Sequence, residues 1–276
     1  MKKAFLLLTL LSIFLNLNVY SQNSFEDFHK IVKTIKPNNQ SFQQISDKLS
    51  KHAKDDFDKA KLIYLWVAEH IDYDVVGLRT FRLPDGSPEV TLKRKKAICD
   101  GYARLFKAMA VYLGLDADLV SGYSKNHKKA KVSKESDHSW NIVRINNRNI
   151  LIDATWGAGN TYGDKFIDNT NYYYFDTDPY EFVFTHVPEL EKHQFLDNPV
   201  SLEEYKKMPY VDNYLFKHNI ITGKEILRYF RNNKNLNLPT VYNTDIEFNI
   251  LKAPYEVKVG NTYDFIIDSK EIKNLE

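Results

Sequence analysis

An excess of charge and a long apolar run are both missing from most of this sequence. It holds 38 basic and 36 acidic residues, and the only charged residues before residue 22 are two lysines, so residues 22–276 carry no formal net charge. This balance favours neither a nucleic acid nor an anionic membrane surface as a partner. After residue 21 no apolar stretch approaches the roughly 20 residues of a spanning helix, so we expect no membrane span there.

The first 21 residues have the pattern of a secretory signal peptide. Two lysines form a basic start, residues 4–17 are mostly apolar, and Val19 and Ser21 put small residues where signal peptidase selects its substrates. We therefore expect an exported protein, periplasmic or extracellular, whose mature chain begins near Gln22. An uncleaved membrane anchor is the alternative interpretation.

Cysteine is nearly absent, because Cys99 stands alone in 276 residues. Exported proteins meet an oxidising compartment, in which cysteines usually occur in disulfide pairs. A single cysteine cannot close a disulfide within the chain, and it points either to pairing with another chain or to a reactive thiol. A buried and inert cysteine is the simpler alternative, since cysteine is among the residue types most often buried.

Helical spacing comes first along the chain, and alternating patterns typical of strands follow. This order indicates an α+β fold rather than an alternating βαβ fold. We expect a signal peptide over 1–21, one main domain over 22–215, and a helical linker with a small C-terminal β segment over 216–276. The pattern predicts helices within 24–71, at 100–113 and within 200–237, a loop at 72–88, and strands at 117–123, 140–146, 149–155, 172–175 and within 245–267.

Cys99 lies where a loop becomes a helix. The N-terminus of a helix carries partial positive charge and free N–H groups, which favour the thiolate form of a cysteine. The same N–H groups can hold the oxyanion of a tetrahedral intermediate. Gly101 permits a close backbone approach beside the thiol, and residues 93–96 add four cationic side chains upstream. A charged run of this kind is more often a solvated surface than part of a site.

A thiolate that attacks an amide needs a base, and the base needs an orienting group. His138 opens a strongly apolar strand, and Asp153 lies inside the next one. Asn146 and Asn147 suit a two-residue hairpin turn, which would place His138 and Asp153 on the same face as diagonal neighbours. A histidine satisfied in the core and an aspartate that caps a turn are the structural alternatives.

Four short motifs in order resemble the transglutaminase-like superfamily, most of all its kyphoscoliosis-peptidase and cytokinesis-protein branch, which has bacterial members. The similarity extends from about residue 57 to about residue 211. Ser139 departs from the alanine expected there, which is a change between small residues. The motifs are Cys99-Asp100-Gly101-Tyr102-Ala103, Gly122-Tyr123-Ser124-Lys125, His138-Ser139-Trp140-Asn141 and Asp153-Ala154-Thr155-Trp156-Gly157.

The resemblance implies a papain-like core with N-terminal helices, a nucleophile helix and an antiparallel sheet. It implies a catalytic triad of Cys99, His138 and Asp153 that acts on peptide or glutamine amide bonds, by hydrolysis or by amine transfer, in a protein or peptide substrate. No cofactor or metal is implied. Trp66 and Tyr73 are candidates for a second oxyanion donor, although core packing accounts for both. A non-catalytic binding or scaffolding module on the same fold is the rival function.

We predict that signal peptidase cleaves after Ser21, because the apolar run has ended there and small residues occupy the selected positions. N-terminal sequencing of the exported protein should therefore start at Gln22. A chain that is retained in the membrane with Met1 still attached would instead make residues 1–21 an anchor.

Overall fold

The structure is a computed structural model that describes residues 25–126, 132–217, 221–233, 249–252 and 266–268. The expected signal peptide lies outside the described residues. The chain divides into two compact units: unit 1 is Met1–Val120 with Ser139–Asp176, and unit 2 is Ser121–His138 with Thr177–Glu276. The helices within the described residues lack the length and apolarity that a membrane crossing requires.

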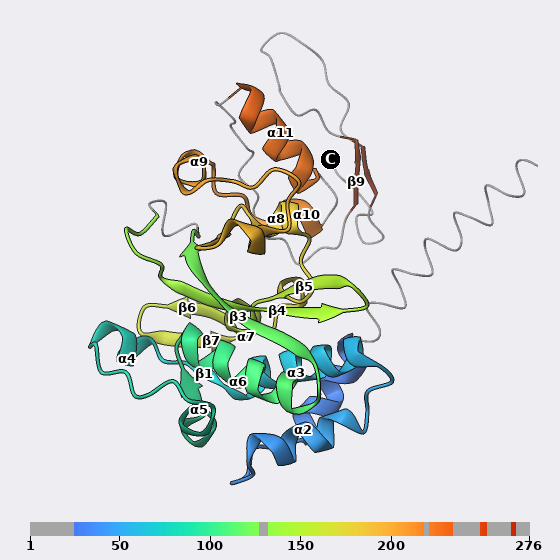
Figure 1. Cartoon of the computed structure of the whole chain (residues 1–276), viewed down its shortest axis with the longest axis vertical. Coiled ribbons are helices and arrows are strands. Elements are labelled where there is room, and N and C mark those ends of the chain that lie inside the picture. Colours follow the sequence, from blue (N-terminus) through green and yellow to red (C-terminus); the bar gives the residue numbers. More distant parts are fainter. Residues whose placement is uncertain (1–24, 127–131, 218–220, 234–248, 253–265, 269–276) are drawn as a thin grey trace, which may run out of the picture. The chain divides into compact units, whose positions relative to one another are not determined.

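Unit 1 is built around α3, a helix whose central residues are buried on every side. The side chains of residues 60–68 in α3 are all buried, and α3 contacts α2, α6 and α7 (Figure 1). Each large apolar side chain removed from water contributes about 1.5–3 kcal/mol, so this helix supplies much of the core. The helices of unit 1 are residues 25–34, α2 (Phe42–Ser50), α3 (Asp56–His70), α4 (Val75–Arg79), α5 (Pro88–Arg94), α6 (Cys99–Tyr112) and α7 (Ala154–Ala158).

Side-chain caps fix where several of these helices begin. Ser41 and Gln44 form a reciprocal capping box at α2, and the Asp55 carboxylate accepts the backbone N–H of Asp58 at α3. Such caps satisfy backbone donors that have no partner inside the helix. The predicted helical content of residues 24–71 is confirmed, because the caps and the apolar spacing agree.

Two short pairings and one hairpin complete unit 1. Strand β1 (Asp72–Tyr73) pairs in parallel with β2 (Lys96–Ala97), and β6 (Gly159–Tyr162) pairs with β7 (Lys165–Asp168). Strands β4 (His138–Ile145) and β5 (Arg148–Ile152) are antiparallel. The two-residue turn between β4 and β5 is confirmed: Asn146 and Asn147 have φ of 50° and 61°, and Ile145 pairs with Arg148.

Three sequence predictions need correction within unit 1. The segment 72–88 is not only a loop, because it contains β1 and α4. The predicted strand at 172–175 is instead a 3₁₀ helix, Tyr172–Tyr174, since the Asn171 side chain accepts the backbone N–H of Tyr173 and turns the chain. The strand predicted to end at Thr155 stops at Ile152, because Asp153 caps α7.

Unit 2 holds the second half of β3 (Asp116–Ser124), which pairs antiparallel with β8 (His186–Pro188). The strand order of the main sheet is β5-β4-β3-β8. Together with the helices that precede it, this antiparallel sheet confirms the α+β class. The remaining elements of unit 2 are α8 (Pro179–Phe182), a 3₁₀ helix at Glu191–Gln194, α9 (Leu202–Lys207), α10 (Asn213–Lys217), α11 (Gly223–Asn233) and the antiparallel pair β9 (Asn249–Lys252) and β10 (Ile266–Asp268).

Lys125 ties the end of β3 to α9. Its ammonium group donates to the carbonyl oxygens of Tyr205 and Met208, each at 2.7 Å, and lies over the Tyr205 ring. These carbonyls belong to the end of a helix, where backbone acceptors lack partners within the helix. Burial lowers the pKa of Lys125 to about 8. The last residue of the second sequence motif is therefore a structural link within unit 2.

We expect Gly101→Ala to destabilise the protein. An added Cβ would lie 2.6 Å from the Ala97 Cβ and 2.7 Å from the Thr91 Oγ1, so α5 and α6 would have to separate. Overpacking of this kind costs about 1–3 kcal/mol. Thermal unfolding should show a melting temperature lower by several degrees. Val111→Ala, at an exposed position on the same helix, is the control, and equal melting temperatures in the two variants would contradict the expectation.

Candidate functional site

Cys99 is the first residue of α6, as the sequence predicted. The residue before it, Ile98, is the N-cap, and no side chain accepts a hydrogen bond from the first turn of the helix. By contrast, the starts of α2, α3, α4, α7 and α9 each have a capping side chain. Cys99 is 8% exposed. It therefore lies at a helix start whose N–H groups no side chain caps.

The segment before Cys99 is held by β1. The backbone N–H of Asp72 donates to the Lys95 carbonyl, and that of Asp74 donates to the Ala97 carbonyl, both at 2.9 Å. This pairing places Tyr73 beside the nucleophile segment. Burial raises the pKa of Tyr73 well above its usual range, and the negative charges of an ionised Cys99 and of Asp153 raise it further. The two predicted site residues of unit 1 thus act on one tyrosine.

Trp66 does not remain a candidate oxyanion donor. Its indole N–H donates to the Ile35 carbonyl at 2.6 Å, and the side chain is fully buried in the core. The interpretation of Trp66 as a core residue is therefore correct. Tyr73 keeps its candidacy because of its position next to Cys99.

Asp153 is a fully buried carboxylate between β5 and α7. Its Oδ1 accepts the backbone N–H groups of Thr155 at 2.8 Å and Trp156 at 3.0 Å, and its own N–H donates to the Tyr174 carbonyl. A buried carboxylate needs such donors to offset the loss of water. The interpretation of Asp153 as a cap thus applies to one of its two oxygens. Its charge also raises the pKa of Tyr64, after the larger effect of burial.

Unit 2 places His138 beside a second histidine. His138 is 7% exposed and opens β4, and its ring centroid is 5.2 Å from that of His186. The residue before it, Asp137, accepts hydrogen bonds from the N–H and hydroxyl of Ser124 and donates its own N–H to the Gly122 carbonyl. The end of β3 therefore fixes the point where β4 begins.

His186 was not part of the predicted triad. It follows the aromatic stretch of residues 172–184 and begins β8. His127, another histidine near the second motif, lies outside the described residues. His186 is 1% exposed and its ring contacts those of His138 and Phe182, and both features depend on tertiary packing.

The register of the hairpin relates β4 to Asp153. The final pair of the ladder joins Asn141 to Ile152. The pairing therefore stops one residue before Asp153, which caps α7 instead of continuing the strand. The Asn141 amide donates to the carbonyls of Ala103 at 3.0 Å and Asp118 at 3.2 Å. This side chain fastens β4 to the nucleophile helix within unit 1.

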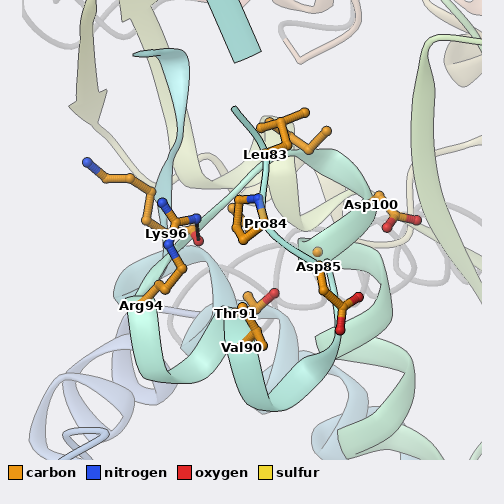
Figure 2. Close-up of a pocket in the computed structure, with 12 residues that line it drawn as sticks. Leu83, Pro84, Asp85, Val90, Thr91, Arg94, Lys96 and Asp100 are labelled. Carbon is orange, nitrogen blue, oxygen red and sulfur yellow. Dashed lines mark hydrogen bonds between the residues drawn. The ribbon is translucent and has the colours of Figure 1, made fainter. Parts of the chain in front are cut away.

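A cavity of about 210 Å³ lies beside the start of α6, and Ile98, Asp100 and Gly101 help to line it. Figure 2 shows Arg94 and Lys96 on one side of the cavity and Asp85 and Asp100 on the other. The hydroxyl of Thr91 lines it too and is buried without a hydrogen-bond partner among the described residues. The cationic run at 93–96 is exposed, as the solvated-surface interpretation expected, while two of its members border this cavity.

The chain is similar in sequence to several known proteins. Residues 43–154 match the transglutaminase-like superfamily. Kyphoscoliosis peptidase of Mus musculus is 33% identical over 184 residues, which are 65% of this chain and 28% of that protein. Cytokinesis protein 3 of Schizosaccharomyces pombe is 31% identical over 118 residues, 41% of this chain and 13% of that protein. A solved structure of a TGase has a TM-score of 0.31 and 22% identity over 54% of this chain and 35% of that chain.

The fold and the sequence motifs define an α+β protein whose one cysteine begins a helix and whose first unit also buries an aspartate. The chain contains a domain of the transglutaminase-like superfamily, matched over residues 43–154. It spans 28% or less of the length of the two curated relatives named above. The resemblance seen in the four sequence motifs is thereby confirmed.

We predict that the cap of α7 distinguishes two substitutions of Asp153. Asn is as good an N-cap as Asp, so Asp153→Asn should keep the bonds to Thr155 and Trp156 and unfold near the wild-type urea midpoint. Asp153→Ala removes the cap and should cost about 0.5–2 kcal/mol. Ser201→Ala, which removes the cap of α9, is the matched control and gives the cost of losing a helix cap at a residue with no proposed catalytic role. Equal stability of Asp153→Ala and the wild type would show that the cap contributes nothing.

Proposed function

We propose that this chain is an exported cysteine acyl-transfer enzyme, a transglutaminase-like protease or acyltransferase, that acts on peptide or glutamine amide bonds. Cys99 is the nucleophile, His138 the general base and Asp153 the group that orients the base. The observation that carries the proposal is the single cysteine at an uncapped helix start, within electrostatic reach of the same tyrosine as a buried carboxylate.

In the proposed reaction the Cys99 sulfur attacks the amide carbon, and its proton goes to His138. The tetrahedral oxyanion accepts hydrogen bonds from N–H groups in the first turn of α6. As the C–N bond breaks, His138 returns the proton to the leaving amine and a thioester remains on Cys99. Water then attacks the thioester and releases a carboxylic acid, or a second amine attacks it and releases a new amide. Either reaction regenerates the Cys99 thiol.

Tyr73 is the proposed second oxyanion donor. A hydroxyl can donate only while it holds its proton, and the raised pKa keeps Tyr73 protonated throughout the neutral range. Burial and the adjacent charges therefore favour the form of Tyr73 that the oxyanion needs.

Asp153 is proposed to orient His138 through Oδ2, since both α7 N–H groups bind Oδ1. The hairpin supports this proposal, since its ladder ends at the pair Asn141–Ile152, and one more pair in the same register would bring His138 and Asp153 to one face, at the spacing of about 7–8 Å between Cα atoms of diagonal neighbours. A single carboxylate would then both start α7 and fix the tautomer of the base.

The relatives indicate which activity to test first. The name of kyphoscoliosis peptidase describes peptide hydrolysis in that protein, so a protein substrate and water as acceptor are the first choice here. Amine transfer onto glutamine is the second. Export remains part of the proposal on the strength of residues 2–21 and is tested by the N-terminal sequencing described above.

The decisive experiment follows the alkylation of Cys99 by iodoacetamide. The wild-type thiol should react faster near neutral pH than free cysteine does, because the uncapped N–H groups at the start of α6 and the proposed base His138 both assist its attack. His138→Ala removes one of these two causes and should slow the reaction partway. His52→Ala, at an exposed turn, is the control and should react as the wild type does.

Turnover of a casein substrate and incorporation of an amine probe complete the test. Asp153→Asn, which retains the cap, should lower turnover strongly; the corresponding change in a serine-protease triad costs about 10⁴ in kcat. A wild-type thiol no more reactive than free cysteine, together with absent turnover, would favour the scaffolding module. A fast thiol unaffected by His138→Ala would keep the nucleophile and assign the base to another residue.

A further inference from the structure

His186 is held in place by contacts of its ring, its Nδ1 and its backbone. It is 1% exposed, and its ring stacks on Phe182 with 4.0 Å between centroids and 9° between planes. Its Nδ1 lies 2.8 Å from the Thr185 Oγ1. The backbone of β8 holds the same residue opposite Ser124. Contacts from three directions thus fix the position and the plane of this ring.

Thr185 also links His186 to Phe182. The Thr185 Oγ1 lies 3.2 Å from the Phe182 carbonyl oxygen and 2.8 Å from the His186 Nδ1, both within hydrogen-bonding distance. The residue on which the ring stacks and the residue bonded to the ring are therefore joined to each other.

The fixed ring faces His138. The two ring centroids are 5.2 Å apart with 48° between the planes, which is contact distance for a tilted aromatic pair. A general base on the first residue of a strand can rotate about two side-chain bonds unless a neighbour restricts it. His186 is a rigid neighbour of this kind, within the same unit.

We propose that His186 is a positioning residue, which holds the His138 imidazole in the orientation needed for proton transfer and acts on the reaction only through His138. This inference rests on the proposed function. His186 does not itself exchange a proton with Cys99 or with the substrate. Thr185 and Phe182 act one step further away, because they fix the ring that fixes the base.

The test is a double-mutant cycle between His138 and His186. His186→Phe keeps an aromatic ring for stacking on Phe182 but loses the bond to Thr185, and His186→Ala loses both. A base displaced by about 1 Å costs on the order of 10²-fold in rate. We expect kcat to fall about 10²-fold in His186→Ala and about tenfold in His186→Phe, with KM changed less than twofold. Thr185→Val should reproduce the effect of His186→Phe.

The cycle separates positioning from a structural role. In a His138→Ala background, a further His186→Phe should change the residual alkylation rate of Cys99 less than twofold, because the residue through which it acts is gone. A structural role would lower the rate equally in both backgrounds. His70→Phe is the matched control, since His70 also stacks on an aromatic ring, Trp66, but belongs to unit 1; it should leave kcat unchanged.

Each outcome identifies which proposal fails. A wild-type protein with no turnover and an unreactive thiol overturns the proposed function. An active wild type with His186→Phe and His186→Ala equally active overturns the role of His186 alone. If His186→Phe lowers the rate as much in the His138→Ala background as in the wild type, His186 acts directly or through the stability of unit 2. That result also overturns the inference.

Discussion

A buried negative charge is the constraint on which the site depends. Asp153 is fully buried, and an isolated carboxylate in such a place would be protonated or would destabilise the fold. The N–H groups at the start of α7 offset part of the cost. The same bonds begin α7 directly after the end of β5, and the Asp153 N–H donates to the Tyr174 carbonyl. One carboxylate therefore both shapes this part of the chain and is the group proposed to orient the base.

Around this charge, unit 1 arranges its polar groups through bonds to main-chain carbonyls. The β1–β2 pair places Tyr73 at the segment before Cys99. The side-chain amide of Asn141 in β4 donates to the carbonyl of Ala103 in α6. These links therefore depend on the course of the backbone that supplies the acceptors.

In unit 2, other contacts hold His138 and His186. Asp137 anchors the start of β4 to the end of β3, and His186, stacked on Phe182, contacts the ring of His138. The first contact fixes the backbone from which His138 projects, and the second lies against its ring. Both would restrict the orientation of His138 in its proposed role as the base.

Local patterns in the sequence determined the helix that begins at Cys99, the hairpin at Asn146 and Asn147, and the superfamily. These features depend on caps, on turn residues and on spacing within one segment, all of which are visible along the chain. The α+β class followed from the order of the segments. The two asparagines also predicted the register of the hairpin, in which Ile145 pairs with Arg148.

Only the tertiary structure decided what each polar group touches. The spacing of residues 172–175 favoured a strand, and the Asn171 side chain made a 3₁₀ helix instead. Trp66 was a candidate donor until its N–H was found on the Ile35 carbonyl, 31 residues away. The stacking of His186 on Phe182 and its burial come from packing within unit 2 and were not predicted from the sequence. Contacts between distant segments depend on which surfaces meet, and no local pattern encodes that choice.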